Sequence, residues 1–335
     1  MKLRRFLLLV GGIGLSIVVA TSLGNPAKVE AAFDQVRWYV FPLIFFIQLG
    51  SYYCNAKYYQ AFFKISGYAP DLRRLYETAL GINFANQAIP SGGVAGTTYL
   101  VQALKPYGVP TGTATLAQLG RYTFTFISFF GVLSIGFVLL FLGGNLGRIS
   151  VRLIVLLMIL VLGAGVLLLT TFSDRKRLET IARPIIKIVN RIGKKVFHRK
   201  HMIVTPQKVD SFMDEFYDGY RDIMGHKGKW PSLLRWTFLA NIAEVSTVYS
   251  VFVGFGIWPN PGVVIAGYTL AIMASISGII INGLGVYEAG MIGTFVALGT
   301  PFALTFAIVT VYRITSMAIF LPIGWHFYRI HLKDS

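Results

Sequence analysis

The chain has 335 residues, of which 55% are hydrophobic and only 13% are charged, and its formal net charge is +17. A soluble globular domain carries about 25% charged residues, so this composition leaves too little polar surface to cover a water-soluble body. The single cysteine, Cys54, excludes an internal disulfide and a metal site built from cysteines. The apolar residues come in long runs, which predict an integral membrane protein.

The positive charge is unevenly distributed. Between Asp174 and Arg235 lie 15 of the 31 Lys and Arg residues and 7 of the 14 Asp and Glu residues. Basic residues beside apolar runs are typical of cytoplasmic loops, whereas a nucleic-acid-binding protein presents its charge on a soluble surface. We therefore expect no nucleic-acid partner, and we predict a cytoplasmic location for residues 174–235 and for both termini.

In chain order, the first apolar run is Phe6–Leu23, which follows three basic residues. It is predicted to be an uncleaved signal anchor, and a cleaved signal peptide is the alternative. Unbroken spans are then predicted at Val36–Ala56, Thr111–Phe141, Val151–Thr171, Trp236–Gly256 and Phe302–Phe327. This pattern predicts a multi-pass protein of the cytoplasmic membrane.

The apolar segment Tyr76–Leu104 is interrupted by the sequence IPSGGVAG. Proline ends a helix and glycine permits turns that other residues resist. The helical pieces on either side would reach only about 21 and 17 Å, against a hydrocarbon core of about 30 Å. We therefore predict a re-entrant helical hairpin that enters and leaves on the cytoplasmic side. The residues predicted to form its break are Pro90, Ser91, Gly92 and Gly93.

A second segment, Val263–Leu298, is interrupted by INGLGVYEAG, whose predicted break lies at Gly283 and Gly285. A shift of 191 positions places Gly92 on Gly283, and it also superimposes the GVP turn at 108–110 on the GTP turn at 299–301. Each half of the chain thus consists of a span, an interrupted segment, a Gly-x-Pro turn and a span with one arginine.

The predicted fold class follows from this repeat: an all-α polytopic bundle with two repeats of inverted topology, each containing a broken re-entrant hairpin. The chain forms one transmembrane domain, 1–335, with repeat halves at 36–142 and 236–327 and a basic helical loop at 174–235. Inverted repeats with broken helices are typical of transporters, which bind substrate near the midplane of the membrane.

Within the loop, residues 181–195 have helical spacing of isoleucines and basic residues that suits a helix on an anionic membrane surface. A second stretch begins at Thr205–Pro206 and continues with one apolar stripe as far as Met224. A packed cytoplasmic cap is an equally good interpretation of both stretches.

Two arginines, Arg121 and Arg313, are predicted near the bilayer centre, about 17 and 18 Å along their helices. A lone arginine there costs from about 3 to more than 10 kcal/mol, so we expect both to have anionic partners. The candidates are Glu244, Glu288 and, near the mouth of the first hairpin, Glu77. An ion pair that only fixes helix packing is one interpretation, and a binding site for a phosphate is the other.

The phosphate interpretation uses further groups. Helices that begin after Pro90 and after Gly283 would offer unpaired backbone N–H groups, and Asn83 and Asn86 would add neutral donors. We predict that Arg121, Arg313 and Glu288 line one cavity with Glu244 nearby. Catalysis has little support, because the sequence has no metal-ligand cluster and no phosphate loop of the Walker type. No cofactor or metal is expected, and the chain is predicted not to be an enzyme.

The same residues resemble a known family, the flippase-like transmembrane domain of lysylphosphatidylglycerol synthases and its stand-alone relatives. The matching segments are IPSGGVAG, YGVP followed by Arg121, GLGVYEAG, ALGTP and VYRITSMAIFLPIGW. The family's motif positions fall here on Pro90, Gly92, Gly93, Gly283, Gly285, Glu288, Tyr312, Arg313, Pro322 and Gly324. The family commonly has a proline at the start of the second hairpin, where this chain has Ile281 and Asn282.

The resemblance implies a lipid flippase, and the synthase activity is not implied because the aminoacyl-transferase domain is absent. The lipids it implies are an anionic or aminoacylated phospholipid or a polyisoprenyl-phosphate-linked lipid. The alternative function is a membrane enzyme or an accessory subunit of lipid or envelope-glycan assembly, for which Asp71 and Glu77 would be the acidic pair. The expected partners are membrane lipids, and a second copy of the chain or envelope-biosynthesis enzymes are left open.

Overall fold

The computed structural model describes residues 31, 33–89, 91, 93–143, 148–173, 177, 180, 206–277 and 286–333. The predicted first span, the helix at 181–195 and the break residues Pro90, Gly92, Gly283 and Gly285 lie outside the described residues. The described helices are α3 (Val40–Ile65), α4 (Leu72–Ala88), α5 (Val94–Leu104), α6 (Thr111–Leu142), α7 (Arg148–Ser173), α9 (Pro206–Gly225), α10 (Trp230–Gly254), α11 (Pro261–Ser277), α12 (Val286–Ala297) and α13 (Phe302–Lys333). Within these residues no strand occurs, so the predicted all-α class is confirmed.

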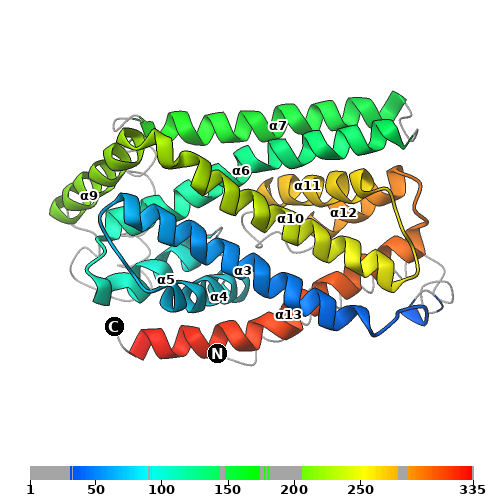
Figure 1. Ribbon diagram of the computed structural model, residues 1–335, viewed down its shortest axis with the longest axis horizontal. Helices are drawn as coiled ribbons and strands as arrows, with labels where there is room; N and C mark the ends of the chain where they lie inside the picture. The colour runs from blue at the N-terminus through cyan, green and yellow to red at the C-terminus, as the bar shows by residue number, and fades with distance from the viewer. Residues whose placement is uncertain are drawn as a thin grey trace, which may run out of the picture.

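The long helices lie roughly along one axis of the molecule, and α9 lies across one end (Figure 1). Three of the described helices are long and apolar enough to cross a bilayer, and they include most of α6, α10 and α13. The helix α7 packs along α6 and leaves large apolar side chains exposed, among them Ile159 and Leu167. Exposed apolar surface of this extent is expected where lipid tails replace water.

The helix α3 extends nine residues beyond its predicted end at Ala56. The charge of Lys57 suggested a membrane boundary there, but its ammonium group is held at the surface of the helix by Gln60 at 3.0 Å. The following turns bury Tyr58 and Phe62 almost completely. The apolar residues after Lys57 therefore pack inward and continue the helix.

The two halves of the chain meet along α3 and α10, which pack together in opposite directions. The backbone N–H of Arg37, just before α3, donates to the carbonyl of Gly254 at the end of α10 at 2.8 Å. Farther along, Gln48 Nε2 donates to Thr247 Oγ1 at 3.0 Å. The beginning of α3 thus lies beside the end of α10.

Two further antiparallel packings flank this pair, α4 against α13 and α11 against α6. Glycine permits the closest approach in both. A Cβ atom at Gly324 on α13 would lie 2.6 Å from the backbone oxygen of Leu80 on α4. A Cβ atom at Gly136 on α6 would lie 2.9 Å from the side chain of Ile265 on α11. Residues larger than glycine would force these helices apart.

Both interrupted segments form two separate helices, as predicted. In the first, α4 packs against α5, and Gly81 leaves room for the ring of Tyr99. In the second, α11 packs against α12, and Gly267 leaves room for the ring of Phe295. The first break includes Gly93, whose φ of 92° lies in the left-handed region that favours glycine.

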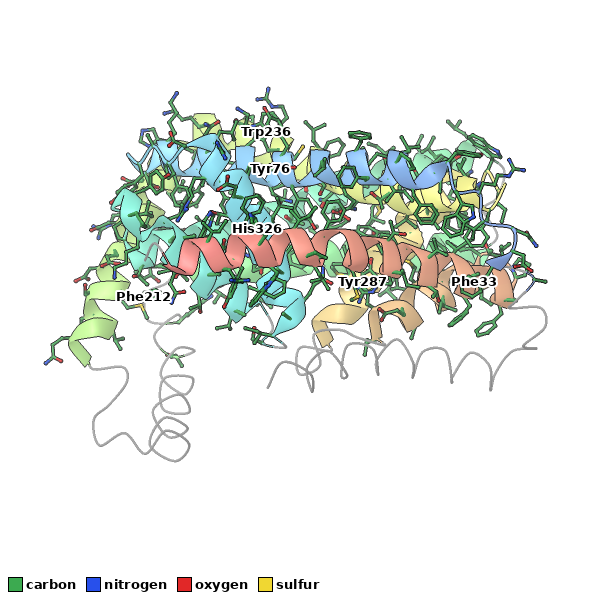
Figure 2. The ribbon with its side chains drawn as sticks, turned by 90° about the horizontal axis from the view of Figure 1, so that it is seen from below. Phe33, Tyr76, Phe212, Trp236, Tyr287 and His326 are labelled. Carbon is green, nitrogen blue, oxygen red and sulfur yellow. The ribbon has the colours of Figure 1, made fainter. Side chains whose placement is uncertain are left out.

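The helix α9 caps the end of the bundle where α6 begins. Its apolar stripe buries Met213 and Phe216, and Glu215 Oε2 accepts a hydrogen bond from the backbone N–H of Gly112 at 2.8 Å. A carboxylate at the first turn of α6 satisfies one of its unpaired donors. The packing of α9 agrees with the cap interpretation of this stretch, and its cytoplasmic location stays a prediction. Phe212 of α9 and Phe33 lie at opposite ends of the molecule (Figure 2).

Candidate functional site

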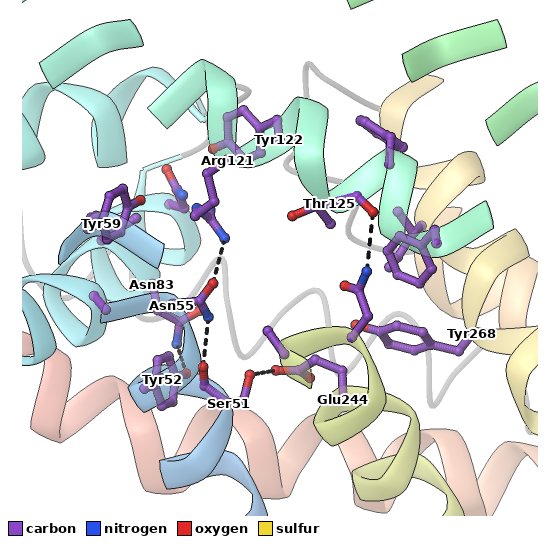
Figure 3. A pocket seen from close by; sticks show the side chains of 18 residues that line it. Ser51, Tyr52, Asn55, Tyr59, Asn83, Arg121, Tyr122, Thr125, Glu244 and Tyr268 are labelled. Carbon is purple, nitrogen blue, oxygen red and sulfur yellow. Dashed lines mark hydrogen bonds between the residues drawn. The ribbon is translucent and has the colours of Figure 1, made fainter. Parts of the chain in front are cut away.

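A polar cavity of about 280 Å³ lies between α3, α4, α6, α10 and α11 (Figure 3). It is lined by four of the residues proposed from the sequence, namely Arg121, Glu244, Asn83 and Asn86. The arginine and the carboxylate come from the middle parts of α6 and α10. The cavity is therefore formed at the packing interface between the two halves of the chain.

One wall of the cavity is formed by Arg121 on α6. Its Nη1 donates to Asn55 Oδ1 at 3.2 Å, and its guanidinium carbon lies 5.0 Å from the centre of the Tyr122 ring. Its Nε is buried and has no hydrogen-bond partner. Among the described residues no carboxylate forms an ion pair with Arg121, so the expected anionic partner is absent. The prediction was wrong because α6 places this side chain opposite the neutral amide of Asn55, while Glu244 lies across the cavity.

The facing wall carries Glu244, a partly buried carboxylate on α10. Its Oε1 accepts from Ser51 Oγ at 2.8 Å, and its Oε2 accepts from Gln48 Nε2 at 3.0 Å. Both donors are neutral and belong to α3. In the part of the chain that the structure describes, Glu244 has no cationic partner. The cavity thus holds one positive and one negative side chain, and no described residue neutralises either of them by an ion pair.

The broken segment closes another side of the cavity. Asn86 Oδ1 accepts from the backbone N–H of Gly96 at 2.9 Å, and Ser91 Oγ accepts from the backbone N–H of Ala95 at 2.9 Å. Both side chains therefore cap the first turn of α5, a role that Ser and Asn serve well. Asn83 donates to the hydroxyl of Tyr52 at 2.6 Å. The two asparagines line the cavity, but their amides also bond to protein groups.

The second arginine lies in a different environment. Arg313 on α13 forms an ion pair with Glu288 on α12, and its guanidinium carbon lies 4.6 Å from the centre of the Tyr287 ring. Neither charged residue is among those that line the cavity. The prediction that Arg121, Arg313 and Glu288 share one cavity is therefore wrong for this structure. The acidic residue at the start of α12 is nearer to Arg313, and the pair is satisfied internally.

Of the acidic pair considered for an enzyme, Asp71 and Glu77, the second is bound by other side chains of the protein. Glu77 accepts from Arg73 Nε at 3.0 Å and contacts the buried His331 at 3.1 Å, while Asp71 precedes the first residue of α4. The other ring nitrogen of His331 lies 2.7 Å from the hydroxyl of Tyr99. These contacts connect α4, α5 and α13. Within the described ranges, no group of three His, Cys, Asp or Glu residues could hold a metal ion.

Sequence reasoning missed the contribution of α3 to the cavity. Gln48, Ser51 and Asn55 bind the two charged side chains, yet none was singled out. They are polar residues in a predicted span, spaced three and four positions apart. This spacing places them on one face of the helix. A polar face on a transmembrane helix is a signal that could have identified them.

These features define a helical membrane protein with a cavity between α3, α4, α6, α10 and α11. The chain belongs to the family described as the lysylphosphatidylglycerol synthase TM region, whose model matches residues 7–324. The match agrees with the resemblance seen in the motifs, and together with the apolar helices it establishes a multi-pass membrane protein.

The chain is also similar to a protein described as a "UPF0104 membrane protein" from Methanothermobacter thermautotrophicus. The two sequences are 26% identical over 247 residues, which cover 73% of this chain and 70% of the relative. That description specifies the membrane and names no substrate.

Proposed function

We propose that this protein moves a lipid with a phosphate-bearing headgroup across the cytoplasmic membrane, and that the polar cavity holds the headgroup. The observation that supports this most strongly is Arg121. It lies within an apolar helix of 32 residues and faces the cavity, and among the described residues its partners, Asn55 and the ring of Tyr122, are neutral. A guanidinium in that position is costly to maintain and suits a bidentate contact with phosphate.

The proposal includes an inverted repeat. The helices α3, α4, α5 and α6 have 26, 17, 11 and 32 residues, and α10, α11, α12 and α13 have 25, 17, 12 and 32. The contacts between the halves also correspond. The second helix of each half packs on the last helix of the other half, α4 on α13 and α11 on α6. Each last helix follows a glycine with positive φ, Gly108 in one half and Gly299 in the other. These correspondences support two copies of one unit.

In this proposal the pairs α4–α5 and α11–α12 are re-entrant hairpins from opposite sides. The four helices would reach about 26, 17, 26 and 18 Å at 1.5 Å per residue, less than a hydrocarbon core of about 30 Å. Broken helices of this kind are tolerated within a bilayer where they line a polar cavity. The first pair does so through Asn83 and Asn86.

The orientation in the membrane is inferred from charge. The end of the bundle that carries α9 also carries Lys227, Lys229 and Arg235. The excess of basic residues in loops supports a cytoplasmic location for this end, by the positive-inside rule. The C-terminal end of α13 would then also be cytoplasmic. A lipid entering the cavity from the cytoplasmic leaflet would meet Arg121 about 17 Å along α6 from Pro110.

The test uses vesicles of phosphatidylglycerol and phosphatidylcholine that contain the purified protein and a trace of phosphatidylglycerol labelled on an acyl chain. An enzyme specific for the headgroup, added outside, measures how fast inner-leaflet lipid becomes accessible. Arg121→Lys keeps the charge and loses the planar fork, so we expect the rate to fall about tenfold or more. Arg235→Lys, at an exposed arginine outside the cavity, is the matched control and should keep the parent rate. Equal rates for Arg121→Lys and the parent, at equal amounts of folded protein, would show that Arg121 does not bind the transported headgroup.

A further inference from the structure

The cavity has two charged walls, and together they say more about the charge of the ligand than Arg121 alone. Arg121 and Glu244 both line the cavity, and among the described residues neither forms an ion pair with the other or with any other side chain. Figure 3 shows them on different sides of the opening, on α6 and α10. Two separated opposite charges are complementary to a ligand that carries both signs.

The hydrogen bonds of Glu244 fit an ionised carboxylate. One oxygen accepts from Ser51 and the other accepts from Gln48, so donors of the protein point at both oxygens. Gln48 is itself fixed in this orientation, because its amide nitrogen also donates to Thr247. An ionised carboxylate with neutral donors only is partly stabilised, and a cation in the cavity would complete its stabilisation.

An organic ammonium group suits this carboxylate better than a metal ion. One carboxylate oxygen of Glu244 already accepts a hydrogen bond from the amide N–H of Gln48. A metal ion bound at that oxygen would need an oxygen ligand in place of this N–H group. Among the described residues that line the cavity, Glu244 is the one carboxylate. The ring of Tyr268 lies beside Glu244 in Figure 3, and tyrosine faces attract ammonium groups. The remaining lone pairs of the carboxylate can accept N–H bonds from an amine.

The size of the cavity sets the scale of the ligand. Its volume of about 280 Å³ lies near the lower end of the range of about 300–1,000 Å³ that is usual for small-molecule sites. A phosphate joined to an amine by a two-carbon linker has about eight non-hydrogen atoms. The acyl chains of such a lipid would have to remain outside the cavity.

We propose that the cavity is specific for a zwitterionic phospholipid headgroup, with one phosphate at Arg121 and one primary amine at Glu244. The inference rests on the proposed function in taking the cavity as a headgroup site. It adds that a purely anionic headgroup satisfies only one wall and leaves Glu244 without a cation. Binding the amine therefore contributes selectivity that the arginine cannot provide.

Water-soluble headgroups test this directly, without transport. Binding of glycerophosphoethanolamine, glycerophosphoglycerol and ethanolamine to the purified protein in detergent is measured by calorimetry. We expect the zwitterion to bind at least tenfold more tightly than either of the others. Glu244→Gln should lower the affinity for glycerophosphoethanolamine to that for glycerophosphoglycerol, and Glu244→Asp should restore part of the difference. Asp218→Asn, at an exposed carboxylate on α9, is the matched control and should change nothing.

The outcomes separate the two proposals. Equal affinity of the zwitterion and the anion, or a difference that survives Glu244→Gln, overturns the amine site and leaves the lipid-transport proposal standing if the rate still depends on Arg121. If neither phosphate-containing headgroup binds to the parent protein, both the amine site and the headgroup cavity are refuted. If Glu244→Gln unfolds, the parent's preference among the three compounds still decides the question.

Discussion

Replacing Glu288 with glutamine removes the negative charge that Arg313 contacts and keeps the size of the side chain. The side chains of the pair are only 14% and 20% exposed, so the arginine would be left as a largely buried charge. Breaking a buried pair by removing one partner costs about 3–5 kcal/mol. The ring of Tyr287 lies 4.6 Å from the guanidinium carbon in the parent and should remain there in the variant, so it does not change the difference between them. We therefore expect Glu288→Gln to lower the free energy of unfolding by about 3–5 kcal/mol.

The double variant Glu288→Gln with Arg313→Gln leaves no uncompensated charge, and its two amides can bond to each other. We expect it to lie within about 1 kcal/mol of the parent, and so to be more stable than either single variant. Unfolding equilibria in mixed micelles with increasing sodium dodecyl sulfate measure all four proteins. The exposed pair Asp218 and Arg221 is the control cycle, in which each change should cost less than about 1 kcal/mol. Additive losses in the Glu288–Arg313 cycle would refute the reasoning, because the two charges would then not be coupled.

Three further predictions concern orientation and packing. Lys227→Cys, in a Cys54→Ser background, should not react with an impermeant thiol reagent added to intact cells, and efficient labelling would contradict the cytoplasmic placement of α9. Gly112→Ala should loosen α9 from α6, seen as faster proteolysis of α9, because the new Cβ atom would lie 2.5 Å from its backbone; unchanged cleavage would count against that contact. Gly324→Ala should lower the free energy of unfolding by about 1–3 kcal/mol, because the new Cβ atom clashes with the backbone of α4. Gly225→Ala, in open space, is the control and should be neutral or slightly stabilising. Equal effects of the two changes would contradict the close packing of α13 on α4.

The helices could be predicted closely from the sequence because hydrophobic runs and Gly-Pro breaks are local signals. The break before α5 lies where Ser91 and Gly93 indicated it. The predicted span ended at Ala56 because Lys57 suggested a membrane boundary, whereas the helix α3 continues to Ile65 through the packing of the following aromatic residues. Local patterns cannot show which way a long side chain turns.

The candidate site was predicted in part for the same reason. Buried charge is visible in a sequence, so Arg121 and Glu244 were both identified. Their relationship depends on how α6, α10 and α3 cross, which no spacing rule specifies. The sequence therefore suggested that the glutamates neutralise both arginines, whereas the structure pairs only Arg313 with Glu288.

The peripheral helix α7 belongs to neither the set α3–α6 nor the set α10–α13. Its position between them affects the number of membrane crossings that separate the two sets. On the proposed topology, each set crosses the membrane twice, once with its first helix and once with its last, because a hairpin returns to its own side. After two crossings the chain is back on the side where the set began. A tandem duplication of the set alone would therefore give both copies the same orientation in the membrane. The one additional crossing by α7, from Arg148 to Ser173, makes the count odd and turns the second copy over. A single apolar helix packed along α6 would then determine whether the number of crossings between the two copies is even or odd.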